Sequence, residues 1–143
     1  MAPVINRNDY SSQRSSYLRF ISSALDEIEN KNGMEESYKD IWTFIYLTLM
    51  EIHKSIQNTI QPWEKRGYWV KVEKFRTEWM WLDPVLNSIG KKVSKEDWKA
   101  LESDRKTLKK ICQDYPSYQR MTIKEPWKGA WKKWKEMKKA SGL

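Results

Sequence analysis

The sequence is poor in the residues that form covalent links, bind metals or break helices. Its 143 residues include one cysteine, Cys112, and one histidine, His53. A single cysteine excludes an internal disulfide and any multi-cysteine zinc site, and a single histidine leaves little for a transition metal. We therefore expect no metal and no cofactor, with Cys112 as an inert packing residue.

Turn-forming residues and long apolar runs are also scarce. Five glycines and five prolines argue against a disordered chain or a many-turned all-β fold. The most apolar stretch, residues 41–50, is too short to cross a bilayer, which takes about 20 residues. The N-terminal segment lacks the apolar core of a secretory signal, so the expected location is cytoplasmic.

Basic residues are scarce in the first part of the chain only. Residues 1–60 hold six Lys/Arg and eight Asp/Glu, whereas residues 61–143 hold 21 and 11. The second half therefore carries the whole of the net charge of +8. Such a surplus attracts an acidic protein, an anionic membrane or nucleic acid. The plain alternative is a solvated basic surface that serves solubility.

Apolar residues at helical spacing predict one all-α domain. We expect an antiparallel bundle of four main helices in residues 11–122, behind a loose arm of residues 1–10. Residues 123–143 are expected to add a short, basic, tryptophan-rich helix docked on this bundle. The length of the whole chain favours a single domain.

The first two helices are predicted from capping residues and apolar stripes. The first begins near Ser11 or Ser12 and ends at Gly33, which suits a left-handed C-terminal residue. The second covers residues 34–60 and ends before Pro62. Its middle is apolar nearly all round, which is typical of burial on several sides or of a homodimer face.

Residues 63–89 are predicted to form the central helix of the bundle. Seven apolar residues recur there with alternating steps of four and three, which produces one continuous seam. Pro84 predicts a kink and Gly90 the end of the helix. Gly67 is a weak point, and the alternative is that it marks the true turn, with the long helix beginning at Tyr68. The seam consists of Tyr68, Val72, Phe75, Trp79, Leu82, Leu86 and Ile89.

The fourth helix is expected to open at Ser94, which with Asp97 resembles a capping box. It ends at Pro116, and Pro126 suits the first position of the final helix. Arg105 interrupts the fourth helix's stripe and is read as a snorkelling side chain, an ion-pair partner or an anion contact. The stripe comprises Trp98, Leu101, Leu108, Ile111, Cys112 and Tyr115.

The final helix is the strongest candidate for a binding surface. Its indoles share one face, and its lysines cover the rest. Such a helix docks on its own bundle with lysines exposed, lies at a membrane surface or enters a partner's groove, and we expect docking. The candidate residues are Trp127, Trp131, Trp134, Lys128, Lys132, Lys133 and Lys135.

A second basic set, Arg66, Lys71, Lys74 and Arg76, alternates with aromatic residues. Interleaved basic and aromatic side chains can grip single-stranded nucleic acid. Any amphipathic helix interleaves these classes, and no helix-turn-helix or zinc-knuckle signal is present, so direct nucleic-acid binding is not expected. Glu73 lies three residues before Arg76 and predicts a structural ion pair.

Three short motifs resemble small uncharacterised helical proteins of cyanobacteria. They are Trp63-Glu-Lys-Arg-Gly-Tyr-Trp, Phe75-Arg-x-Glu-Trp79 and Pro126-Trp-x-Gly-Ala-Trp131. The resemblance covers the second half of the chain. It carries no activity with it, so no site residues are transferred.

Together these features predict a non-catalytic interaction module. It would engage an acidic protein or an anionic membrane surface through its basic second half. A carrier of an apolar or aromatic ligand between tryptophan-rich helices is the alternative. An enzyme is not expected, because no nucleophile–base pair and no metal set is visible.

Overall fold

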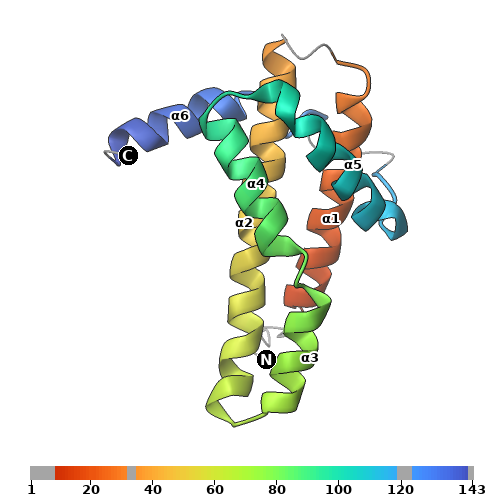
Figure 1. The fold of residues 1–143 in the computed structure, drawn as a ribbon, viewed down its shortest axis with the longest axis vertical. Helices are drawn as coiled ribbons and strands as arrows, with labels where there is room; N and C mark the ends of the chain where they lie inside the picture. Colours follow the sequence, from red (N-terminus) through yellow and green to blue (C-terminus); the bar gives the residue numbers. More distant parts are fainter. Residues whose placement is uncertain (1–8, 32–34, 119–123, 142–143) are drawn as a thin grey trace, which may run out of the picture.

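A computed structural model describes residues 9–31, 35–118 and 124–141 (Figure 1). Within these ranges every regular element is a helix, which confirms the predicted all-α class. The predicted arm, residues 1–10, lies largely outside the described residues, and Asp9 already belongs to the first helix.

Helices α1 (Asp9–Ile28) and α2 (Glu36–Lys65) form the long pair along which the other helices are arranged (Figure 1). Helix α1 begins slightly before the predicted Ser11 or Ser12. Its predicted stop at Gly33 lies outside the described residues. The predicted stripe of α1 faces the core. Its buried members are Ile21, Ala24, Leu25 and Ile28.

Helix α2 is the centre of the fold, because it packs against α1, α3, α4 and α6. The prediction that the centre lies in residues 63–89 was therefore wrong. The apolar middle of α2 is wide because several neighbours bury it, and a homodimer face stays a prediction. Its buried apolar residues are Tyr38, Ile41, Trp42, Ile45, Leu49, Ile52, Ile56 and Ile60.

The predicted end of α2 before Pro62 was wrong, because the helix continues through the proline. It stops at Gly67, whose φ of +73° is the left-handed conformation that favours glycine. The Gly67 N–H donates to the carbonyl of Glu64 at 3.0 Å, and the Tyr68 N–H donates to that of Trp63 at 2.9 Å. This pair of bonds is a Schellman C-cap. Gly67 therefore marks the turn, as the alternative predicted, but the long helix that the alternative placed from Tyr68 was wrong, because α3 covers only Trp69–Glu78.

The following segment is two helices, α3 (Trp69–Glu78) and α4 (Leu82–Ser94), and no kinked continuation. Pro84 lies in the first turn of α4, where its missing N–H leaves no bond unmade. Gly90 lies inside α4 and does not end it. A Cβ there would come within 2.8 Å of Cε1 of Tyr46, so this glycine permits the close approach of α2 and α4.

Helix α4 ends at a second Schellman cap, which the sequence analysis missed. Glu96 takes the left-handed position with φ of +55°, a role in which glycine is usual. The Asp97 N–H donates to the carbonyl of Lys92 at 2.8 Å, and the Glu96 N–H donates to that of Val93 at 3.1 Å. Ser94 is consequently the last residue of α4, and the predicted capping box was wrong.

The predicted fourth helix is shorter and is flanked by two 3-10 turns. The elements are η1 (Trp98–Leu101), α5 (Glu102–Ile111) and η2 (Cys112–Asp114). Leu101, Leu108 and Cys112 of the predicted stripe are buried in the common core. This part of the chain covers α1 and the end of α4.

The last helix, α6 (Ala130–Ala140), lies beside the N-terminal half of α2 and projects from the bundle (Figure 1). It begins one turn later than the predicted start at Pro126. Residues 126–129 form a turn, and Gly129 has a φ of +79°.

Candidate binding surfaces at the two ends of α2

The two predicted basic sets lie at opposite ends of α2. Helix α6 contacts residues 40–46 of α2, whereas Arg66 and Lys71 lie at the turn between α2 and α3 (Figure 1). From Trp42 to Glu64 the helix advances about 33 Å at 1.5 Å per residue. This is several times the screening length of about 8 Å at physiological salt. The structure therefore does not bring the two sets together into one surface.

At the α6 end, each of the three indoles packs edge-on against an aromatic ring of another element. The ring centroids lie 5.9–6.1 Å apart, within the range of favourable edge-to-face pairs. The pairs are Trp127 with Phe44, Trp131 with Trp98, and Trp134 with Tyr46. Trp127 is buried and the other two indoles are half-buried.

A carboxylate from α2 holds the start of α6. Asp40 is buried and accepts hydrogen bonds from the backbone N–H groups of Gly129 and Trp131, both at 3.1 Å. These N–H groups are unsatisfied donors at the positive end of the helix dipole, where an acidic side chain stabilises the helix. Sequence reasoning missed Asp40 because an N-cap is normally sought next to its helix, and this one lies 89 residues away.

The predicted lysines at this end are in contact with solvent, and the first of them precedes α6. Lys128, Lys132, Lys133 and Lys135 are exposed. The ammonium group of Lys135 lies 3.5 Å from the ring centroid of Trp131, so this lysine also covers an indole by a cation–π contact.

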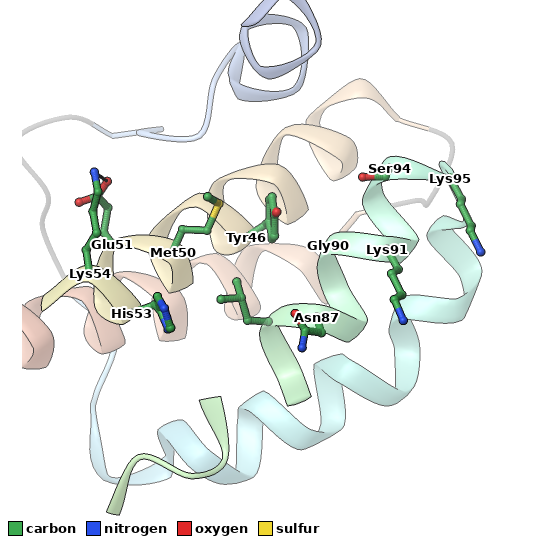
Figure 2. A pocket seen from close by; sticks show the side chains of 11 residues that line it. Tyr46, Met50, Glu51, His53, Lys54, Asn87, Gly90, Lys91, Ser94 and Lys95 are labelled. Carbon is green, nitrogen blue, oxygen red and sulfur yellow. Dashed lines mark ion pairs between the residues drawn. The ribbon is translucent and has the colours of Figure 1, made fainter. Parts of the chain in front are cut away.

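Two adjoining grooves meet at Ser94, and we call them together the basic groove. The first, of about 510 Å³, lies between α2 and α4 with Tyr46, Met50 and Leu86 in its wall (Figure 2). The second, of about 470 Å³, lies between α4 and α6 with Val93, Trp131 and Trp134 in its wall. Seven lysines and three glutamates line them: Lys54, Lys91, Lys95, Lys132, Lys135, Lys138, Lys139, Glu51, Glu96 and Glu136.

The other end of α2 carries what we call the aromatic tip, residues 65–71. Tyr68, Trp69 and Val70 are consecutive there and remain 48%, 58% and 84% exposed. Lysine and arginine side chains surround them. The exposed basic residues are Lys65, Arg66, Lys71 and Lys74.

Arg76, the fourth residue of the second basic set, is held by two carboxylates. Its guanidinium lies 3.2 Å from Glu64 and 3.6 Å from Glu73, so the predicted Glu73–Arg76 ion pair is confirmed. Lys71 lies 4.4 Å from the ring centroid of Trp63. Arg66 and Lys74 have no carboxylate within ion-pair distance among the described residues.

Arg105 is an ion-pair partner, but of carboxylates other than the Glu73 group for which it was considered. It forms a two-pronged pair with Glu102 and a second contact to Glu29 at 3.3 Å. Lys109 joins Glu29 at 2.6 Å, so this group links α1 to α5.

The remaining titratable residues are arranged as structural groups. His53 Nδ1 lies 3.2 Å from a carboxylate oxygen of Asp83, and both side chains are largely exposed. Among the residues that the structure describes, no three His, Cys, Asp or Glu side chains converge as a metal site would require. Burial raises the pKa of the Cys112 thiol to about 11.

None of the described helices has the length and apolarity needed to cross a bilayer.

Comparison of the chain with protein-family models, curated proteins and solved structures gives no match. The resemblance to cyanobacterial helical proteins therefore stays a prediction.

Proposed function

We propose that the protein is a non-catalytic helical module that binds an acidic, amphipathic segment of another protein in the basic groove. The observation that carries this proposal is the combination of an aromatic and aliphatic wall with a lysine-rich rim. Helix-in-groove recognition uses such a combination: apolar side chains of the partner enter the groove, and charges at the rim set orientation and specificity.

The charge balance of the rim supports an acidic partner. Seven lysines face three glutamates, and Lys54 already neutralises Glu51 at 3.8 Å. A basic partner would meet this excess of like charge, which costs binding energy and slows association. Both grooves are open to solvent and lie outside the core, which favours a binding surface over the carrier alternative. We also propose that the protein is cytoplasmic.

Photo-crosslinking tests the proposal. Benzoylphenylalanine in place of Met50, which is 42% exposed in the wall of the first groove, would react with whatever occupies it. The modified protein is irradiated in a lysate of the source organism, and the crosslinked peptides are sequenced by mass spectrometry. We expect a reproducible segment with an apolar face and a net negative charge.

Charge reversal supplies the matched control. Lys135→Glu with Lys139→Glu inverts part of the groove rim, and Lys106→Glu with Lys110→Glu makes the same charge change on the exposed face of α5. The first pair should reduce crosslinking at least about fivefold, since each rim charge acts within a screening length of the groove. Equal loss in both pairs, or crosslinked segments without acidic residues, would contradict the proposal.

A further inference from the structure

The aromatic tip is the largest run of exposed apolar side chains in the described chain. Other exposed large apolar residues, such as Met80 and Met137, occur singly, whereas Tyr68, Trp69 and Val70 are consecutive. Scattered exposed apolar residues are normal, but contiguous ones mark a surface that meets another apolar phase.

The local backbone fixes these residues in the exposed position. The Schellman cap at Gly67 reverses the chain between α2 and α3, and Trp69 is the first residue of α3. Within residues 9–31, 35–118 and 124–141, no other helix lies beyond this turn (Figure 1). The tip is therefore convex, and neighbouring helices cannot cover it.

The charges around the tip are positive. Residues 61–76 hold five basic and two acidic residues, a net charge of +3. Both acidic residues, Glu64 and Glu73, lie within ion-pair distance of Arg76. The remaining basic side chains, Lys65, Arg66, Lys71 and Lys74, form pairs with no carboxylate among the described residues.

We propose that the aromatic tip docks the protein onto an anionic membrane by inserting Trp69, Tyr68 and Val70 into the lipid interface. Tryptophan and tyrosine favour the headgroup level of a bilayer, because their rings are apolar with one polar atom. Lysine and arginine beside them are attracted to anionic lipid at about 1 kcal/mol per residue near the surface. Together the tip supplies both the apolar and the electrostatic contribution that interfacial binding needs.

The shape of the tip favours a membrane over a protein partner. A stable protein interface buries about 800 Å² on each side, and three side chains on a convex turn provide much less. A lipid interface imposes no such requirement, because it deforms around a small wedge. This membrane proposal does not depend on the basic groove, which has no lining residue in the tip and whose nearest lining residue on α2, Lys54, lies about 15 Å from Glu64 along the helix.

A site-specific probe tests insertion directly. Val70→Cys, at a position 84% exposed, is labelled with an environment-sensitive fluorophore. Cys112 takes no label at about pH 7, because it is buried and its thiol pKa is raised to about 11. We expect a blue shift on vesicles of phosphatidylcholine with about 30% phosphatidylserine, a weaker one on phosphatidylcholine alone, and reversal by salt. The same label at Lys106→Cys on α5 should not respond.

Two unlabelled variants separate the apolar and the charge contributions. Trp69→Ser with Val70→Ser should lower the vesicle partition coefficient at least about tenfold, because most of their exposed apolar area would enter the lipid. Lys65→Gln with Lys74→Gln should lower it only on anionic vesicles. All four positions are exposed, so circular dichroism and the melting temperature should stay unchanged in both variants.

Three outcomes would overturn the proposal. The first is a Val70→Cys label that stays solvated on anionic vesicles. The second is vesicle binding that falls with Lys132→Glu and Lys135→Glu on α6 but not with the tip variants, which would make α6 the membrane contact. The third is a label that responds to a single-stranded oligonucleotide and not to vesicles, which would make the tip a nucleic-acid site.

Discussion

Both ends of α2 carry tryptophan and lysine, but the two ends differ in how far their tryptophans are exposed to solvent. At the α6 end, Trp127 is buried against Phe44, while at the tip Trp69 is 58% exposed. The difference lies in the facing elements: α2 and η1 offer aromatic rings to the indoles at the α6 end, and none of the described helices faces the tip. Tryptophan content alone therefore does not distinguish a docking face from a binding surface.

The two ends also differ in what orders them. The start of α6 depends on Asp40, a side chain from another helix. The tip depends on backbone hydrogen bonds within its own turn, around Gly67. Order at the α6 end therefore relies on contacts from distant segments, whereas the turn at the tip is closed by local backbone hydrogen bonds.

The largest expected difference between the two ends is the loss of stability when one indole is removed from each. Trp127→Ala should lower the free energy of unfolding by about 3–5 kcal/mol, because it empties a buried site. Trp69→Ala should change it by no more than about 0.5 kcal/mol, because the side chain is largely exposed. Urea denaturation of the two variants measures both values. Similar losses in the two variants would remove the contrast between the ends.

A smaller effect is expected from Asp40→Ala. Loss of the carboxylate leaves the Gly129 and Trp131 N–H groups without a partner and should cost about 1–2 kcal/mol, as for an N-cap. Hydrogen exchange should quicken in residues 130–140 and stay unchanged in residues 69–78. Asp40→Asn keeps one acceptor oxygen and is expected to fall between wild type and Asp40→Ala. Faster exchange at the tip would mean that the two ends are coupled.

The smallest effect concerns a group that belongs to neither end. A hydrogen bond from Lys109 lowers the pKa of Glu29, so folding favours the ionised carboxylate. This contribution is present above the ordinary glutamate pKa and is lost as pH falls through the lowered value. Glu29→Gln should therefore flatten the acid limb of the melting temperature measured against pH. A changed response of α6 or the tip to vesicles in this variant would show that the link between α1 and α5 reaches the ends.

Much of the helical content was predictable, while the helix ends were not. Apolar spacing identified the buried stripe of α1 and the wide apolar surface of α2, because side chains that share a helix face are fixed by helix geometry. Several prolines and glycines did not mark the helix ends and kink that they predicted. Pro84 falls in the first turn of α4, where a proline is tolerated, whereas α2 continues through Pro62 to Lys65 at the loss of one backbone hydrogen bond, and Gly90 is required by the ring of Tyr46 and not by a chain reversal.

The sequence by itself determined the helical class, the shared helix face of Trp131 and Trp134, and the surplus of lysine in the second half. Only the tertiary structure decided that Asp40 caps α6, that the basic residues divide between two ends, and that Trp69 stays exposed while Trp127 is buried. The physical reason is that spacing within a helix is a local property, whereas burial and charge proximity depend on which distant segment faces each side chain.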